Sequence, residues 1–398
     1  MATRALAYDS PPLSPTSPFP FLPLEIQLDI LSLSTPPDTV AGRAERRRHL
    51  ERCSRVCRAW KRPAQKELFG DVEFDLRAPG SGDGEAEARS EALRARTVGL
   101  KQLAYKAKRL KIAMDDTENG AMVHPFRIPW RVWIVDDYRG VAELEVELWR
   151  AEVGGRNTWE DEVLAPIMPT LQALTLIRGG HSSPHLSPDV YLSASSLTRL
   201  TLIGISFISW FPPASFPSVR TLICDRLSIS ETYGQPRPSR NLFLPFPALQ
   251  AAAFNGTDLL DLTFSEAPEG LKHLLLGQNS YRAAVPGARR AARRAGLDSL
   301  VSLLPSSLTT LSLYPNRRAP PVADLAALLQ RSPVPPCLLQ LKELNLPRTE
   351  EWIDPGASES VRFLKVVELF CENRGVRVKR WEEGREWEVR DWRCEEDE

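Results

Sequence analysis

Few residues in this chain combine the types and the spacing that metal binding requires. Cys53 and Cys57 stand four positions apart, so a helix would bring both thiols to one face, where they could share a metal ion. His181 and His185 fall in a different segment, and two imidazoles alone cannot complete a tetrahedral site. We therefore expect the two cysteines to be small core residues, and we predict no metal site and no cofactor.

Known arrangements of catalytic residues are equally hard to find. The sequence contains neither a phosphate-binding loop of the form GxxxxGKS or GxxxxGKT nor the motifs HExxH and GxSxG. The glycines from Gly80 to Gly84 are too close together for GxGxxG, and adjacent acids such as Asp136 and Asp137 are usually solvated. These observations predict no catalytic residue, so we expect a protein that is not an enzyme.

The charge and cysteine content limit the class of protein further. The 398 residues carry 51 Lys and Arg against 51 Asp and Glu, so no net charge attracts the chain to nucleic acid or to an anionic membrane. The most apolar window, 200–216, is interrupted by glycine, serine and proline and falls short of a membrane span. Six scattered cysteines do not make a disulfide framework. We expect an intracellular protein of the cytoplasm, the nucleus or both.

The elements that must position any functional side chain begin after a proline-rich leader. Residues 1–20 contain five prolines and little that could be buried, so we predict that they are disordered. Residues 21–76 carry a mostly helical pattern and form the first predicted module. Residues 77–91, rich in Gly, Ala and charge, are predicted to be a linker.

The first helix of this module is predicted from Pro23 to Leu33, with proline in the first turn, where its missing N–H is harmless. At about 100° per residue the apolar side chains form two opposed stripes, one of Leu24, Leu28 and Leu31 and one of Ile26, Ile30 and Leu33. A surface helix needs one stripe for its own core, so the second indicates a face offered to a partner. Strict alternation from Leu24 to Ile30 also fits a strand, which is the alternative.

A second apolar series in the module consists of Leu50, Cys53, Cys57, Trp60 and Ala64. Its spacing alternates between three and four residues, which predicts a one-faced helix, bent or broken at Pro63. Ten Lys or Arg and two Glu lie between Thr39 and Lys66. Most of these arginines fall on the face away from the apolar stripe, which favours a solvated surface over nucleic-acid binding.

In order and spacing, several short motifs of this module resemble an F-box. They are Leu22-Pro23-Leu24-Glu25-Ile26, Ile30-Leu31, Cys53-Ser54-Arg55-Val56-Cys57-Arg58-Ala59-Trp60 and Glu67-Leu68-Phe69. The resemblance covers about 50 residues. It implies that the exposed stripe docks on a Skp-family adaptor. The adaptor-facing or module-core residues it implies are Leu22, Pro23, Leu24, Ile26, Ile30, Leu31, Val56, Trp60 and Phe69.

The rest of the chain repeats the pattern apolar-x-x-apolar-x-apolar. Clear copies begin at Val141, Leu171, Leu197, Val219, Leu271, Leu308 and Leu341, with weaker ones at Ala107 and Leu249. Each copy predicts a short strand and a returning segment, and such units stack because neither part alone can bury its apolar side. In two copies an asparagine follows, in the leucine-rich-repeat form LxxLxLxxN. We predict an irregular leucine-rich-repeat solenoid over residues 92–380.

Some returning segments and the end of the chain have recognisable patterns of their own. Helical periodicity marks 91–106, 321–330 and 358–372, and Val376 with Val378 indicates a closing strand. Residues 381–398 carry nine acids against three arginines. This acidic tail is either a polar cap or disordered.

The residues between the buried positions of each predicted strand point to the opposite face of the sheet. They are weakly polar in the central copies and charged in the outer ones, a profile typical of a protein interface with a charged rim. The predicted target-binding residues are Ile177, Ile203, Ile223, Leu275 and Tyr314. The alternative is that loops or the tail cover these side chains, which then belong to the core.

The chain therefore has a predicted α/β fold, in which an all-α F-box-like module is followed by the repeat array. It is similar to F-box/leucine-rich-repeat proteins of the fungal type. The resemblance implies a substrate-recognition subunit of an SCF-type cullin-RING ubiquitin ligase. Such a subunit binds a Skp-family adaptor, and through it a cullin, and holds a target protein whose identity the sequence does not give. The alternatives are a scaffold that sends nothing for degradation and, less favoured, a nucleic-acid-associated protein.

Overall fold

A computed structural model describes most of the predicted elements. The described residues are 24–36, 43–56, 58–68, 70–76, 107–116, 138, 140–151, 164–179, 185–186, 194–207, 211–229, 243–256, 267–277, 305–314, 322–348, 358–381 and 392. The chain divides into two compact units, Met1–Leu68 and Phe69–Glu398. The predicted leader, the linker and the helix at 91–106 lie outside the described residues.

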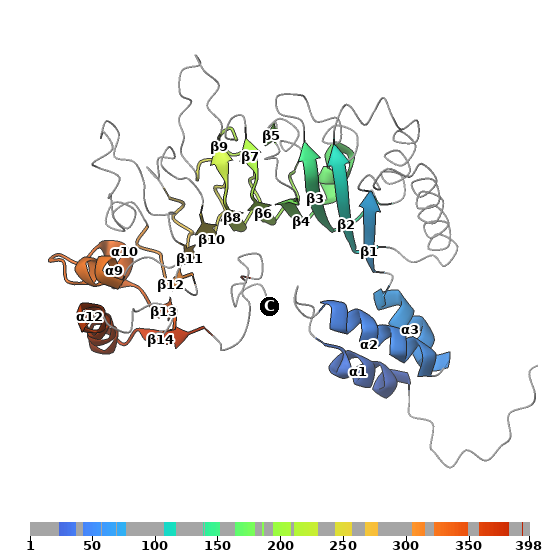
Figure 1. Ribbon diagram of the computed structural model, residues 1–398, viewed down its shortest axis with the longest axis horizontal. Coiled ribbons are helices and arrows are strands. Elements are labelled where there is room, and N and C mark those ends of the chain that lie inside the picture. Colours follow the sequence, from blue (N-terminus) through green and yellow to red (C-terminus); the bar gives the residue numbers. More distant parts are fainter. Residues whose placement is uncertain are drawn as a thin grey trace, which may run out of the picture. The chain divides into compact units, whose positions relative to one another are not determined.

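The first unit is helical and contains α1 (Leu24–Ser34), α2 (Arg43–Val56) and α3 (Arg58–Leu68) (Figure 1). Residues from Leu24 onward are therefore helical, and the strand alternative is wrong. The second apolar series is divided between α2 and α3, and α3 continues through Pro63, so of the two predicted effects of this proline, a bend or a break, the break is wrong. Among the described side chains of this unit, the buried apolar cluster comes from all three helices and consists of Leu31, Leu50, Cys53 and Ala64.

The second unit is built on a parallel sheet of eleven strands, and its strands lie in the order of the chain (Figure 1). They are β1 (Asp71–Leu76), β2 (Arg109–Asp116), β3 (Glu143–Ala151), β4 (Ala173–Arg178), β6 (Arg199–Ile203), β8 (Thr221–Asp225), β10 (Ala251–Asn255), β11 (His273–Leu276), β12 (Thr310–Leu313), β13 (Glu343–Leu346) and β14 (Arg377–Arg380). Three two-residue strands, β5 (His185–Leu186), β7 (Ser206–Phe207) and β9 (Ser228–Ile229), form a second small parallel sheet.

Every copy of the repeated sequence pattern coincides with one of the large-sheet strands, from β2 to β13, and the predicted closing strand is β14. The strand β1 was missed. Asp71–Leu76 pairs in register with β2, whereas the sequence pattern placed these residues in the helical module. The predicted helices at 321–330 and 358–372 are α9 (Val322–Leu329) and α12 (Ser358–Arg374). Shorter helices are α7 (Ala165–Ile167), η2 (Met168–Thr170) and α10 (Pro336–Leu339).

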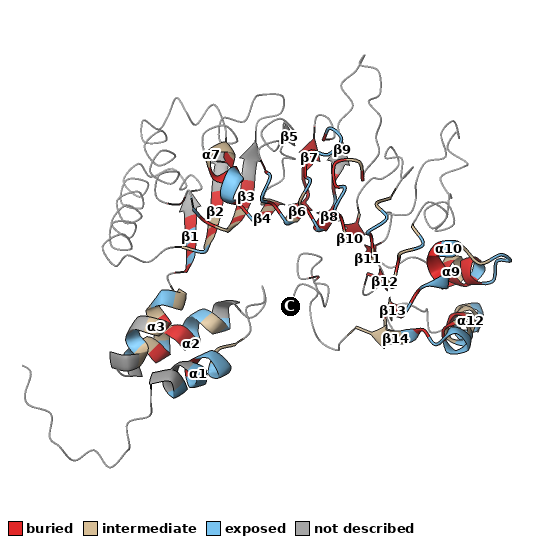
Figure 2. Cartoon of the chain, turned by 180° about the vertical axis from the view of Figure 1, so that it is seen from behind, coloured by how far each residue is buried: buried red, intermediate tan, exposed pale blue. Residues whose placement is uncertain are grey.

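The core of this unit follows from the register of the strands. The second apolar position of each copy forms one continuous row across the sheet, which runs Val72, Leu110, Leu144, Leu174, Leu200, Leu222, Ala252, Leu274, Leu311, Leu344 and Val378. Apart from half-buried Val378, these side chains are almost fully buried. Figure 2 shows the burial continuing along the row of strands.

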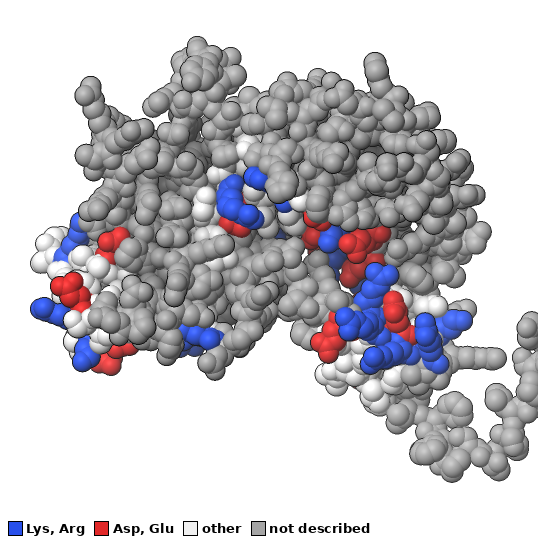
Figure 3. All heavy atoms as spheres, in the orientation of Figure 1, with Lys and Arg blue, Asp and Glu red and all other residues white. Residues whose placement is uncertain are grey.

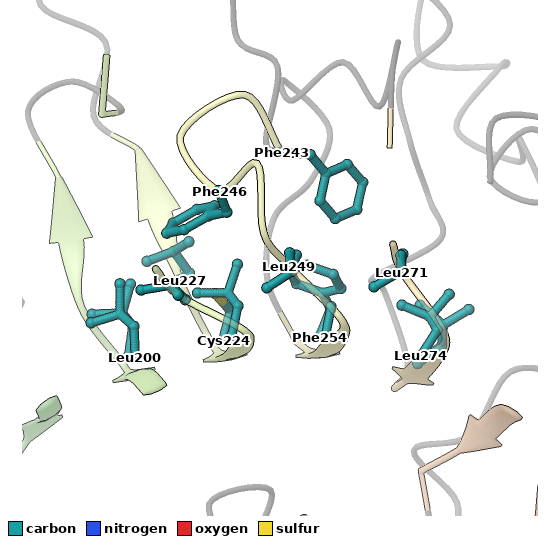
Figure 4. Close-up of a cluster of buried hydrophobic side chains, with 14 of the residues drawn as sticks. Leu200, Cys224, Leu227, Phe243, Phe246, Leu249, Phe254, Leu271 and Leu274 are labelled. Atoms are coloured by element: carbon teal, nitrogen blue, oxygen red, sulfur yellow. The ribbon is translucent and has the colours of Figure 1, made fainter. Parts of the chain in front are cut away.

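Aromatic side chains from the segments before the strands complete this core. Figure 4 shows Phe243 and Phe246 above Cys224 and Phe254. These two residues are paired in register and belong to a second buried row, two positions further along the strands. Phe246 stacks on Phe216 with ring centroids 5.2 Å apart, and Phe243 meets Phe254 edge to face at 6.2 Å. The described parts of the connecting segments here, 211–220 and 243–250, contain no helix, and their phenylalanine rings supply the cover that a helix would otherwise give.

A buried polar contact fixes the turns at the ends of β8, β10 and β11. The Asn255 side-chain nitrogen donates a hydrogen bond of 2.8 Å to the Asp225 carboxylate. Gly277 lies against the same side chain, and a Cβ added at Gly277 would come within 2.1 Å of Asn255 Oδ1. This position therefore requires glycine because of space.

We expect Gly277→Ala to lower the free energy of unfolding by about 1 to 3 kcal/mol, the usual cost of overpacking. Gly140→Ala is the matched control, since nothing lies within 4 Å of a Cβ built there. Urea unfolding of both variants measures the difference. Equal stability of the two variants would contradict the role given to this close contact.

Candidate functional site

The helix α1 exposes the second of its two predicted apolar stripes. Ile26, Ile30 and Leu33 have 44%, 37% and 87% of their surface exposed, whereas Leu31 from the other stripe is only 5% exposed. Six large apolar side chains are exposed among the described residues, and three of them are on this one helix. Because a contiguous apolar face in water is typical of an interaction site, this face is the first candidate site.

Polar contacts link α2 to α3 and to the end of α1. Arg46 of α2 donates to the Pro36 carbonyl oxygen at 3.2 Å and forms an ion pair with Glu67 of α3, also at 3.2 Å. His49 lies 3.2 Å from the Ser34 hydroxyl. The small apolar core and these contacts together fix which face of α1 is left exposed.

The remaining predicted adaptor-facing residues are only partly described. Trp60 is half-buried and packs against the core of the helical unit. Leu24 and Val56 lie in α1 and α2, but their side chains are outside the described ones. Leu22, Pro23 and Phe69 are outside the described residues altogether.

Basic side chains gather on the surface of the helical unit, as Figure 3 shows. Exposed members of this group are Arg47, Arg48, Arg52, Arg55, Lys61 and Lys66. Arg47 forms an ion pair with Glu51 at 3.3 Å, one turn further along α2. This arrangement fits the solvated helix surface that the sequence predicts.

Comparison with known proteins identifies this unit. The family model for F-box-like domains matches residues 19–70, which include all three helices. No curated protein matches the chain at a significant level. Residues 19–70 are therefore an F-box-like domain, and the exposed stripe of α1 belongs to it.

The second candidate site is the face of the large sheet opposite its apolar core. At the first strands this face is charged, because Arg109 pairs with Glu143 at 2.5 Å and Lys111 lies between two glutamates. The Lys111 ammonium is 3.3 Å from Glu73 and 3.5 Å from Glu145. Burial alone would lower the pKa of Lys111, but the charges of these two carboxylates outweigh it and raise the pKa.

At the other end of the sheet, Glu343 accepts hydrogen bonds from both neighbouring cations on β14. Lys379 is 3.0 Å away, and Arg377 also donates to the same carboxylate oxygen. Burial alone would raise the pKa of Glu343, but the hydrogen bonds from Lys379, Arg377 and Asn345 outweigh it and lower the pKa. At both ends of the face, basic side chains thus form ion pairs with acidic side chains of the neighbouring strand.

The centre of this face contains apolar side chains, and they are covered. Ile223, Leu275 and Tyr314 are buried in one cluster with Ala251, Ala253 and Trp392. Ile203 is also buried but outside this cluster, and Ile177 is half-buried. Of the five predicted target-binding residues the structure thus brings three together, beneath a side chain from the acidic tail.

The sequence pattern missed Trp392 as a site residue. The one signal available is that the acidic tail contains three tryptophans, at positions 381, 387 and 392, and nothing in their spacing distinguishes Trp392. Its partners on the sheet are far away in sequence, since its carbonyl oxygen accepts a hydrogen bond from Arg199, 193 residues earlier. The spacing of apolar residues along the chain does not predict a contact between segments so far apart.

The described residues contain no group of three or more His, Cys, Asp and Glu placed to hold a metal ion. None of their helices is long and apolar enough to cross a membrane.

Burial raises the pKa of the Cys337 and Cys371 thiols to about 11, so both are protonated at neutral pH. Cys53 and Cys224 are buried as well, and burial raises their pKa too.

We expect Glu343→Gln to lower the free energy of unfolding at pH 7 by about 1 to 3 kcal/mol, because two charged donors lose their ionised acceptor. The folded-state pKa of Glu343 lies below its ordinary value of 4.5. Its contribution is therefore fully present above that value and is lost as the pH falls through the folded-state pKa. Urea unfolding from pH 7 to pH 3 should show the variant and the native protein converging.

Glu269→Gln is the matched control, because Glu269 is an exposed glutamate of the same unit. It should change stability little at any pH. A Glu343 variant whose deficit stayed constant down to pH 3 would show that the carboxylate charge is not the cause.

Proposed function

We propose that the chain is the substrate-recognition subunit of an SCF-type cullin-RING ubiquitin ligase. The observation that carries this proposal is the exposed stripe of α1, in which Ile26, Ile30 and Leu33 face solvent within the F-box-like domain. F-box domains generally bind adaptors of the Skp family. A Skp-family adaptor covers this stripe and links the chain to a cullin.

We propose in addition that the sheet unit is an irregular leucine-rich-repeat solenoid that holds the target protein. The parallel pairing of strands in chain order supports this assignment, because each strand and its return then form one unit stacked on the preceding unit. The apolar centre and the charged ends of the opposite face support the assignment of that face to target binding.

The mechanism is proximity rather than chemistry by this chain. The F-box-like domain holds the ligase and the sheet unit holds the target, so each raises the local concentration of the other. No residue of this chain carries ubiquitin in this mechanism, and the protein acts without a catalytic centre or cofactor of its own. It works in the cytoplasm, the nucleus or both, where ligases of this class act.

The double variant Ile26→Asp, Ile30→Asp tests the adaptor site. Two carboxylates in a desolvated apolar interface should cost about 2 kcal/mol or more, which is about a thirty-fold loss of affinity. Binding of a purified Skp-family adaptor to the full-length protein is measured by calorimetry. Both positions are exposed in the free chain, so the fold should be retained.

The matched control is Val361→Asp, Leu369→Asp, which alters two equally exposed apolar residues on α12. The control should bind the adaptor as the native protein does. A folded Ile26 and Ile30 variant with native affinity would refute the adaptor site. If the variant loses the adaptor but the abundance of co-purifying proteins in cells stays unchanged, the chain is a non-degradative scaffold.

A further inference from the structure

A tryptophan from the acidic tail lies on the central part of the sheet face. Trp392 is 6% exposed and packs with Ile223 of β8, Leu275 of β11 and Tyr314, which follows β12. Half-buried Trp381 packs against the same cluster. One aromatic side chain from the end of the chain thus covers the apolar centre of a face that is charged at both ends.

The strands supply a place of suitable size for an aromatic ring. In the register of the sheet, Ala253 of β10 lies between Ile223 and Leu275. Ala251, two residues earlier, points to the same side. The two alanines are much shorter than Ile223 and Leu275, and both belong to the cluster in which Trp392 is buried.

At this site, hydrogen bonds to main-chain carbonyl groups add to the packing of the Trp392 ring. The Arg199 guanidinium of β6 donates a hydrogen bond of 2.9 Å to the carbonyl oxygen of Trp392. The Trp381 indole N–H donates to the Leu313 carbonyl oxygen at 2.8 Å and holds the chain near the cluster. Any peptide segment can offer a main-chain carbonyl oxygen to Arg199, so this hydrogen bond does not distinguish one sequence from another. The selectivity of the site therefore comes from the aromatic side chain.

We propose that this face is a docking site for an extended target segment carrying a tryptophan or similar large aromatic residue, and that Trp392 is an internal occupant which the target displaces. The proposal rests on the proposed function, because it names the chemistry of the target. It also explains how a face predicted for binding is buried in the free chain. Acidic residues next to the aromatic residue suit the positive charge of Arg199, and the sequence around Trp392 carries such acids at positions 391 and 395.

The test uses full-length Trp392→Ala and a fluorescent peptide with the sequence of residues 388–398, in which Cys394 is replaced by serine. The peptide contains Trp392 as its single tryptophan. Anisotropy titration should show saturable binding to the variant. Binding to the native protein should be at least about ten-fold weaker, because a tethered occupant competes at high effective concentration.

Two matched comparisons identify the contacts. A peptide with alanine at position 392 should not bind. In the Trp392→Ala background, Arg199→Gln should weaken the native peptide about ten-fold, since it removes a charge-assisted hydrogen bond. Arg220→Gln should leave binding within about two-fold, because Arg220 is an exposed arginine that precedes the neighbouring strand β8.

Three results would overturn the proposal. One is a folded Trp392→Ala protein that fails to bind the peptide, and another is equal binding by the native protein and the variant. If Trp392→Ala does not fold, the titration is repeated with Trp392→Leu, which keeps an apolar side chain in place. If neither variant folds, Trp392 is an obligate part of the core and the proposal is wrong.

The titration is independent of the adaptor, so the two proposals fail separately. Adaptor binding by Trp392→Ala should equal that of the native protein, since Trp392 and α1 belong to different units. Loss of peptide binding with adaptor binding intact would leave the proposed ligase role standing. If the adaptor test fails but the peptide binds as expected, the proposed ligase role is wrong and the docking site on the sheet face stands.

Discussion

The sheet unit depends on one constraint, which is that neighbouring strands pair in parallel without a shift between their repeated motifs. Because the side chains of a strand alternate between two faces, a slip of one residue would move Leu200 or Leu274 from the core to the opposite face. The register of the strands keeps every copy aligned with the next. A continuous apolar row and a separate outer face are both direct results of this alignment.

The same register explains the charges on the outer face. Residues at equivalent positions of adjacent strands are neighbours, so Arg109 meets Glu143 and Arg377 meets Glu343. Such pairs contribute little to stability when exposed, but they keep the ends of the face polar. Between these ends, β10 and β11 supply alanine and leucine to the face, and Trp392 packs with them.

Much of this arrangement could be predicted from sequence, and the exceptions have physical reasons. The apolar spacing of the repeats and of α1 reports burial directly, so the large-sheet strands from β2 to β14 and the exposed stripe with Ile26 and Ile30 could be inferred, whereas the two-residue strands β5, β7 and β9 could not. The strand β1 shows the same alternation at Val72 and Phe74, but it follows the helices so closely that it was assigned to them. Packing of Trp392 is a contact between distant segments, which local periodicity does not encode.

The order of the strands has a consequence for synthesis of the chain on the ribosome. Each large-sheet strand pairs with the strand made just before it, so it can join the sheet as it emerges and need not wait for a distant partner. Trp392 is the exception, since its partner Arg199 is made 193 residues earlier. Trp392 therefore cannot cover the apolar centre of the outer face until residue 392 itself has been made, and until then this centre is open to chaperones and to any other polypeptide.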